Sequence, residues 1–153
     1  DSLMGDSQRA FATLIFTAQG MPLIYSGQEA CLDKKLKFFV RDTIEWDTCA
    51  LTDFYSELIK LKKNNAALWN GDFGGKMISI RTSKDKKIFA FYREKDGNRV
   101  VVLLNLSKKP VSFKPVLIGI EGEYTEYFTD QKTRLVKSVN ITLDPWGYKV
   151  VVK

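Results

Sequence analysis

The sequence contains no histidine, and this absence limits the chemistry that its 153 residues can perform. Hydrolases that activate serine or cysteine with an imidazole are excluded, as are most general-base mechanisms. Two cysteines without histidine also cannot form a usual zinc site. Any catalysis by this chain would therefore depend on carboxylates.

Cysteine is also scarce, because the chain has only Cys31 and Cys49, which fall within one irregular stretch. A disulfide across this stretch is one interpretation. A pair of free thiols is the favoured interpretation, since disulfides persist mainly in oxidising compartments.

The sequence lacks an apolar run long enough to cross a bilayer, and no basic-then-apolar leader precedes its first helical pattern. We therefore expect no membrane partner. The sequence starts abruptly at Asp1-Ser2-Leu3, and we interpret it as a fragment of a longer protein. Extracellular, periplasmic and cytoplasmic locations all stay open.

A net charge of +6 raises the question of nucleic-acid binding. Such a surface concentrates its cations on one face and interleaves them with aromatic residues. Here the lysines are scattered over turns and one helix end, which is typical of solvated surface. They are Lys34, Lys35, Lys37, Lys60, Lys62, Lys63, Lys84, Lys86, Lys87, Lys108 and Lys109. No nucleic-acid partner is predicted.

Apolar residues at three-and-four spacing predict two helices, over residues 7–19 and 51–63, with Thr52 as the N-cap of the second. Pro22 blocks continuation of the first helix. The apolar run 23–25 that follows predicts a buried strand, whose carboxyl end is where helix-alternating sheets place their binding sites. Residues 30–50 show no periodicity and predict a long ordered loop, a feature that is often functional.

Beyond residue 72, short β-rich runs replace the helical patterns, and turn signals separate them. Asp96-Gly97 between two apolar runs predicts a tight hairpin, since glycine accepts the positive φ of such a turn. Strands at this spacing without helices between them indicate an antiparallel sandwich. The predicted strands are residues 77–82, 88–93, 100–106, 111–113, 124–128, 139–143 and 148–152.

Four segments in this order resemble the α-amylase family, glycoside hydrolase family 13. They are residues 20–29, residues 39–46, residues 54–71, and a β region that contains Phe91-Tyr92-Arg93, Asn105-Leu106-Ser107 and Leu143-Asp144-Pro145-Trp146-Gly147-Tyr148. The resemblance implies an α/β barrel remnant of two helices and the eighth strand in residues 1–71. An all-β antiparallel Greek-key sandwich would follow in residues 72–153.

The resemblance also implies a parent enzyme that cleaves α-glucosidic bonds of starch-like glucans with retention, so its partner would be an α-glucan or maltooligosaccharide. That chemistry needs two carboxyl groups about 5–5.5 Å apart. In the family they come from the fourth and fifth barrel strands, and a third aspartate lies in an Asn-His-Asp motif after the seventh. Because none of these is present, and Asp1 lacks the motif, we expect no catalytic residue in this chain and no activity from it alone.

What remains is one wall of the parent's substrate site, made by Tyr25, Gln28 and Glu29. The resemblance implies that Gln28 or Glu29 steadies neighbouring active-site groups by hydrogen bonds. The alternative is that Glu29 only ties the following loop to the barrel. The family often binds calcium, but its usual ligands lie in an earlier domain, so no metal or other cofactor is assigned to this chain.

Three tryptophans, Trp46, Trp69 and Trp146, could stack on sugar rings, but packing is the favoured role for each. Two non-enzymatic functions stay open, a carbohydrate-binding module and an amylase-like transporter ectodomain. A barrel remnant would also expose apolar surface, because an isolated parallel strand is unstable. We expect the sandwich to carry the stability, with the preceding residues packed on it, self-associated, or part of a larger protein.

Overall fold

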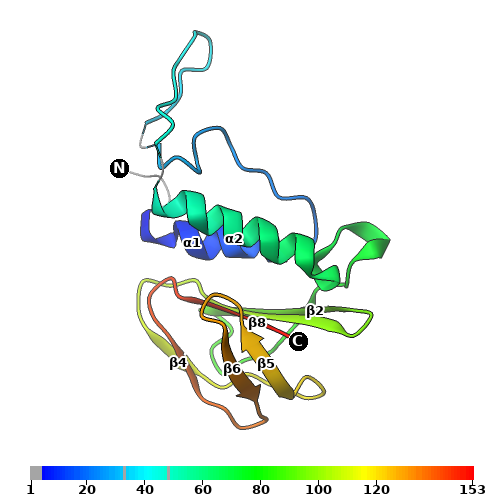
Figure 1. The fold of residues 1–153 in the computed structure, drawn as a ribbon. Coiled ribbons are helices and arrows are strands. Elements are labelled where there is room, and N and C mark those ends of the chain that lie inside the picture. Colours follow the sequence, from blue (N-terminus) through cyan, green and yellow to red (C-terminus); the bar gives the residue numbers. More distant parts are fainter. Residues whose placement is uncertain (1–4, 33, 48) are drawn as a thin grey trace.

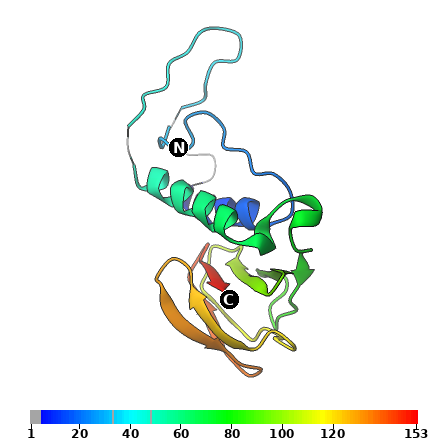
Figure 2. The same ribbon diagram turned by 45° about the vertical axis from the view of Figure 1, so that its right-hand side comes forward.

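The computed structural model describes residues 5–32, 34–47 and 49–153. Two helices lie side by side and cover one face of a β-sheet, and the long connection between them rises on the side away from the strands (Figures 1 and 2). The helices are α1 (Gln8–Thr17), which follows the 3-10 turn η1 (Gly5–Ser7), and α2 (Ala50–Asn64). Two short 3-10 turns, η2 (Ala66–Leu68) and η3 (Gly71–Phe73), lead from α2 to the strands.

Both predicted helices are confirmed, but the predicted cap of the second is wrong. Cys49 is the N-cap of α2, because its backbone is extended there, with φ of −140° and ψ of 171°. Thr52 occupies the third helical position, and its hydroxyl accepts the Cys49 N–H at 3.2 Å. Lys62 and Lys63 stand in the last turn, where cations complement the helix dipole.

All strand pairs in the two sheets are antiparallel, as predicted. The strands are β1 (Ile78–Ser79), β2 (Ile88–Lys95), β3 (Asn98–Asn105), β4 (Val111–Phe113), β5 (Gly122–Glu126), β6 (Gln131–Leu135), β7 (Ile141–Leu143) and β8 (Tyr148–Val152). The larger sheet has the order β1-β2-β3-β8-β5-β6, so β8 lies in its interior, and β4 pairs with β7 in a second sheet.

The predicted hairpin joins β2 to β3. Lys95 pairs with Asn98, which leaves Asp96 and Gly97 as a two-residue loop with φ of 49° and 84°. Positive φ at both positions is the type I′ turn, whose twist matches that of the paired strands. The hairpin prediction is confirmed.

Side chains of the six-stranded sheet contribute to two hydrophobic clusters, one on each face. Val100, Val102 and Leu104 join α1 and α2 in the first cluster, while Val101 and Leu103 join β4 and β7 in the second. This alternation follows from the two-residue period of a strand. Burial on both faces explains why β3 is a continuous apolar run. The first cluster contains side chains of both helices and of β3, so the helices and this face of the sheet share a core.

Arg93 of β2 joins the helical layer to the sheet by hydrogen bonds, and its side chain is buried in this core, with only 1% exposed. Its Nε donates to the Gly75 carbonyl at 2.8 Å, its Nη1 to that of Ala18 at 3.0 Å, and its Nη2 to that of Trp69 at 2.7 Å. Ala18 and Trp69 cap the C-terminal ends of α1 and η2, where carbonyl groups attract a cation. Backbone dipoles thus take the place of a carboxylate partner.

The structure contradicts two predictions about residues 20–50, the strand at residues 23–25 and the free thiols of Cys31 and Cys49. Residues 23–25 form no strand, because no strand among the described residues lies beside them to complete a ladder, and Leu23 is 80% exposed. The interpretation of Cys31 and Cys49 as free thiols is also wrong, because a disulfide joins them. The turn after Ser26 brings the Cys31 Cα to 6.3 Å from that of Cys49, a separation that a disulfide can span.

Candidate functional site

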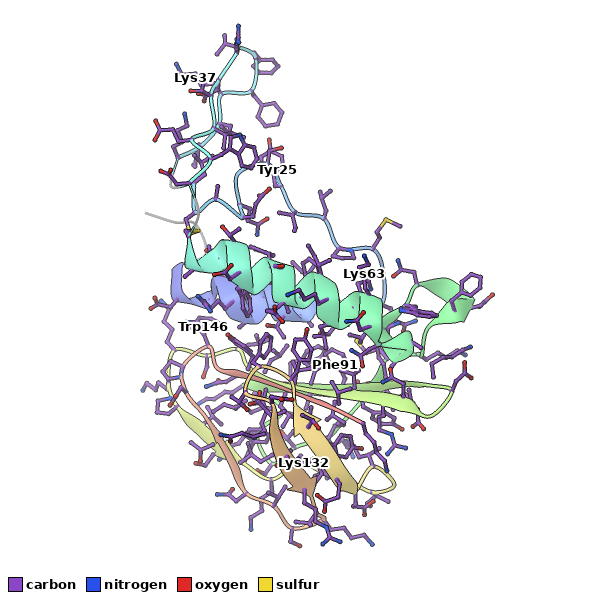
Figure 3. The ribbon with its side chains drawn as sticks, viewed as in Figure 1. Tyr25, Lys37, Lys63, Phe91, Lys132 and Trp146 are labelled. Atoms are coloured by element: carbon purple, nitrogen blue, oxygen red, sulfur yellow. A yellow bond between two sulfur atoms is a disulfide. The ribbon has the colours of Figure 1, made fainter. Side chains whose placement is uncertain are left out.

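The three residues predicted to wall a substrate site lie at the base of the projecting connection. Figure 3 shows Tyr25 there, beyond the helices on the side away from the sheet. The Gln28 amide joins two neighbours, since its Oε1 accepts the Tyr25 N–H at 3.2 Å and its Nε2 donates to the Tyr55 hydroxyl at 2.6 Å. Gln28 therefore fixes the turn to α2, while the Tyr25 side chain stays 60% exposed.

Tyr55 supports this turn from the core. Its ring is buried and contacts that of Phe16, with 6.1 Å between ring centroids. Burial raises the pKa of Tyr55, and the charge of Glu29 raises it further, while hydrogen bonds with Gln8 and Gln28 oppose this shift. The hydroxyl therefore stays protonated near neutral pH and is available to both amides.

Glu29 acts through two different groups. Its backbone carbonyl accepts the Thr52 hydroxyl at 2.8 Å, which ties the turn to the first turn of α2. Its carboxylate atom Oε2 is buried and has no hydrogen-bond partner in the described part of the chain. A buried acceptor without a partner is costly, so this oxygen is suited to a donor that these residues do not supply.

The tryptophans are placed differently from one another. Trp146 packs against Phe11, with 6.1 Å between ring centroids, and its packing role is confirmed. Trp46 is 63% exposed on the projecting connection, so the prediction that it packs is wrong; that segment extends beyond the reach of the core. Trp69 is 44% exposed, and its indole donates to the Lys63 carbonyl at 3.0 Å.

Trp69 borders an apolar groove of 580 Å³ on the side of α2 that faces residues 21–25. Its lining is mostly apolar and also includes two lysines and one amide. The lining residues are Phe16, Pro22, Ile24, Ile59, Lys62, Lys63, Trp69 and Asn70. The groove adjoins the extended segment that lacks strand neighbours, so both features leave apolar surface uncovered.

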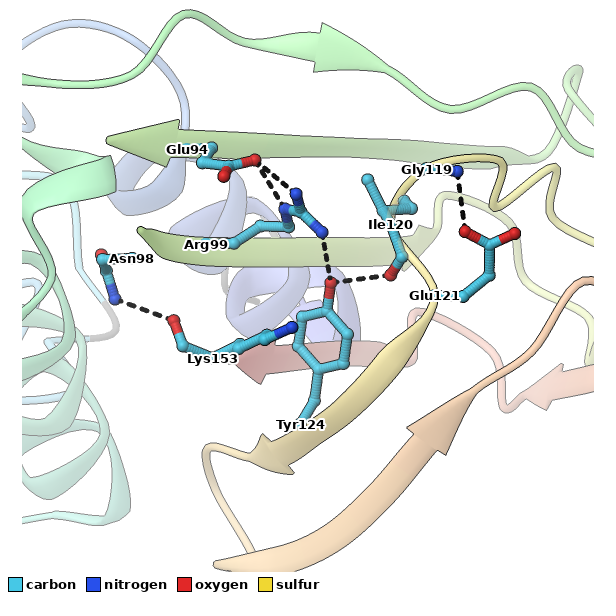
Figure 4. A network of polar contacts seen from close by, with 8 residues as sticks. All are labelled: Glu94, Asn98, Arg99, Gly119, Ile120, Glu121, Tyr124 and Lys153. Carbon is cyan, nitrogen blue, oxygen red and sulfur yellow. Dashed lines mark hydrogen bonds and ion pairs between the residues drawn. The ribbon is translucent and has the colours of Figure 1, made fainter. Parts of the chain in front are cut away.

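A separate polar network lies in the sheet (Figure 4). Arg99 pairs with Glu94 at 2.7 Å and donates to the Tyr124 hydroxyl at 3.2 Å, which in turn donates to the Ile120 carbonyl at 2.7 Å. The network ties β2, β3 and β5 together, which gives it a structural role in the sheet. Glu123 is exposed and forms an ion pair with Arg134 at 3.4 Å.

Within residues 5–32, 34–47 and 49–153, no group of three histidine, cysteine or carboxylate side chains is placed to hold a metal. None of the helices in the described part of the chain combines the length and apolar character needed to cross a bilayer. Asp1, which we do not expect to be catalytic because it lacks the family's motif, lies outside the described residues.

Comparisons with known proteins bear on the same regions. Residues 78–150 match the family described as Maltogenic Amylase, C-terminal domain. A 1,4-alpha-glucan branching enzyme of Prochlorococcus marinus is 28% identical over 136 residues, which cover 82% of this chain and 18% of that protein. A cyclomaltodextrinase of a Bacillus species is 32% identical over 110 residues, which cover 68% of this chain and 19% of the relative.

The fold is also found in solved structures. A noncanonic maltogenic alpha-amylase, AmyB from Thermotoga neapolitana, superposes with a TM-score of 0.81 at 19% identity, and the match covers 97% of this chain and 36% of that one. The helices and the sheet therefore occur together in that protein as they do here. The chain spans about a fifth of the length of the curated relatives it matches.

Proposed function

Since this chain carries the C-terminal region of α-amylase-family proteins, we propose that it is part of an enzyme that cleaves α-glucosidic bonds of starch-like glucans. The observation that carries this proposal is the match to a cyclomaltodextrinase over 68% of the chain, combined with the maltogenic-amylase domain at residues 78–150. The chemistry would be the retaining mechanism of two carboxylates. This chain supplies neither of them and is inactive alone.

The proposed division places the end of a (β/α) barrel in residues 1–71 and a Greek-key sandwich in residues 72–153. The segment 21–25 supports it, because it is apolar in part, is largely exposed and pairs with no strand in the described part of the chain. The uncovered apolar groove beside it supports it as well. In the parent, neighbouring barrel strands would pair with this segment and fill the groove; without them, this surface favours self-association.

Tyr25, Gln28 and Glu29 would then form one wall of the substrate site. Gln28 positions the wall, because its amide links the Tyr25 backbone to the Tyr55 hydroxyl. The buried, unpartnered Oε2 of Glu29 would accept a hydrogen bond from a neighbouring active-site group. The role of these residues is to hold reacting groups in place, and the catalytic carboxylates come from the rest of the parent.

Glucan transfer is a second candidate reaction, favoured by the branching-enzyme relative. Hydrolysis and transfer share a glucan substrate and differ in whether water or a sugar hydroxyl accepts the cleaved chain. A carbohydrate-binding module or a transporter ectodomain remains the non-enzymatic alternative.

The test is release of chromophore from a chromogenic maltooligosaccharide by the 153-residue chain and by the full-length gene product. We expect activity from the longer protein only. Chromatography of the products distinguishes hydrolysis, which shortens the substrate, from transfer, which also yields longer chains. Activity in neither protein would contradict an enzymatic function.

The role of Gln28 is tested in the full-length protein by Gln28→Leu, which removes both hydrogen bonds of its amide. We expect kcat/KM to fall about ten-fold, because a displaced wall misplaces the reacting groups. Gln131→Leu, at an exposed position of β6, is the matched control and should leave kcat/KM unchanged. Equal activity of the two variants would contradict a positioning role.

A further inference from the structure

The connection between α1 and α2 exposes large apolar side chains at its far end. We name its residues 34–47 the aromatic loop; it projects away from the helices (Figures 1 and 3). Phe38 is 87% exposed, Phe39 97%, Val40 61% and Trp46 63%. So many large apolar side chains exposed within nine residues mark a contact surface rather than ordinary loop surface.

The aromatic loop is held in shape by its own polar contacts. The Asp42 carboxylate accepts the Lys34 ammonium at 3.0 Å, the Lys37 N–H at 3.1 Å and the Thr43 N–H at 2.8 Å. These bonds close the tip across residues 37–42. The Cys31–Cys49 disulfide closes the base. The rings are therefore presented by an organised loop, which lowers the entropy lost on binding.

The exposed groups combine flat rings with hydrogen-bond donors. Phe38 and Phe39 are neighbours, with 5.9 Å between ring centroids. Arg41 is exposed between Val40 and Asp42, and among the described residues no carboxylate pairs with it. A pyranose ring offers apolar C–H faces and hydroxyl edges, which suit aromatic rings and guanidinium donors respectively.

The charge of the loop favours a neutral partner. It contains four basic and three acidic side chains, so its net charge is only +1. A lipid-binding loop with apolar residues at its tip usually gains affinity from clustered cations on an anionic surface. Here the carboxylates of Asp42, Glu45 and Asp47 stand close to the tip in sequence and would oppose such a surface.

We propose that the aromatic loop binds a stretch of α-glucan chain, through Phe38, Phe39 and Trp46 as stacking platforms and Arg41 as a donor. The loop begins within five residues of Glu29, so it extends the proposed substrate wall outward. The inference rests on the proposed function, because the glucan is the substrate of that site. It assigns to the loop the recognition of longer chains, beyond the sugars next to the bond that is cleaved.

The test uses the full-length protein in native gels containing amylopectin, together with KM for amylose and for a chromogenic maltotrioside. The triple variant Phe38→Ala, Phe39→Ala, Trp46→Ala should lose at least ten-fold in glucan affinity, and Trp46→Ala alone about five-fold. KM for amylose should rise while KM for the short substrate stays constant. Phe73→Ala is the matched control, because Phe73 is 77% exposed but lies on η3.

The outcomes separate this inference from the proposed function. Hydrolysis with unchanged gel retardation and amylose KM in the triple variant would overturn the inference and leave the function intact. Gel retardation that depends on the three rings, without hydrolysis by the full-length protein, would support glucan binding by the aromatic loop and contradict the proposed hydrolase function. Binding to vesicles of phosphatidylcholine and phosphatidylglycerol that is lost in the triple variant, without retardation by glucan, would overturn the inference in favour of a lipid surface.

Discussion

Lys62 and Arg93 donate to the same oxygen, the carbonyl of Leu68, at 2.8 Å from Nζ and 3.3 Å from Nη1. Two cations thus converge on the last residue of η2 in a partly buried junction. Burial lowers the pKa of both side chains, and the charge of Arg93 lowers that of Lys62 further. Carbonyl dipoles offset the two charges, so the contact between helices and sheet depends on backbone geometry.

Replacing Arg93 by methionine should destabilise the whole chain, because its volume is largely kept while the carbonyls of Gly75, Ala18 and Trp69 lose their donor. We expect the free energy of unfolding in urea to fall by about 3 kcal/mol or more. Arg134→Met is the control, since Arg134 is 72% exposed in its pair with Glu123, and it should leave stability unchanged. A loss below 1 kcal/mol for Arg93→Met would contradict the role of Arg93.

Gly74→Ala should disturb the same junction by a steric route. A Cβ at this position would lie 1.8 Å from the Trp69 carbonyl oxygen and 2.9 Å from Arg93 Nη2, so the backbone must move. Gly119→Ala provides the comparison, because Gly119 has φ of +81° but no atom within 4 Å of such a Cβ. Thermal unfolding should show a loss of about 1 kcal/mol for Gly119→Ala, from backbone strain alone, and at least twice that for Gly74→Ala. Equal losses of stability for the two variants would contradict a steric conflict between a Cβ at position 74 and the Trp69 carbonyl.

The disulfide should be measurable by counting thiols. Denatured protein prepared without reductant should show no reactive thiol, and two should appear after reduction. Replacing both Cys31 and Cys49 by serine should lower the free energy of unfolding by up to about 3 kcal/mol, the chain-entropy value for a loop of 18 residues. Two reactive thiols before reduction would show that the free pair is the native state.

Acid should loosen the aromatic loop at Asp42. Its hydrogen bond with Lys34, and those with the Lys37 and Thr43 N–H groups, lower the pKa of its carboxyl from 3.8 to about 2. A folded-state pKa below the unfolded value gives a contribution to stability that is complete above pH 3.8. This contribution is lost as the pH falls toward 2. A carboxyl ¹³C titration should place the midpoint near 2, and a midpoint near 3.8 would contradict the closed tip.

Alkali should act on Tyr127, whose hydroxyl donates to the Glu57 carbonyl at 2.9 Å. Burial, then the charge of Glu57 and the hydrogen bond to it, raise the pKa of Tyr127 from 10.0 to about 12. A raised folded-state pKa means that the contribution to stability is complete below pH 10.0 and is lost as the pH rises through 12. Absorbance at 295 nm should show a tyrosine step near pH 12 that Tyr127→Phe removes. A spectrum without that difference would contradict the contact.

The parts of the fold that the sequence predicts are those with a local cause. Asp96-Gly97 determines its turn by φ preference alone, and the runs at β4 and β8 are apolar enough to give the observed boundaries. Strand β6 was missed because its sequence, Gln-Lys-Thr-Arg-Leu, is almost wholly polar. It forms at the edge of the sheet through backbone pairing with β5, and only Leu135 is buried.

The candidate site was harder to predict, because its features depend on contacts between distant segments. The Gln28–Tyr55 bond and the disulfide each join the turn after Ser26 to α2 or its N-cap. Arg93 has a signal in the sequence. It lies two residues after Phe91 in β2, so its side chain is on the same face as that of Phe91, which is buried beneath the helices. A charged residue at such a position indicates a buried network of partners.

The interior place of β8 bears on how the chain folds during synthesis. Val150 of this last strand contributes to the cluster beneath α1 and α2, and β8 separates β3 from β5 in the larger sheet. The helices are made before β8, and the surface that covers them stays incomplete until residue 152 has left the ribosome. Their apolar faces therefore stay uncovered while the strands between α2 and β8 are synthesised, and a chaperone would act during this interval.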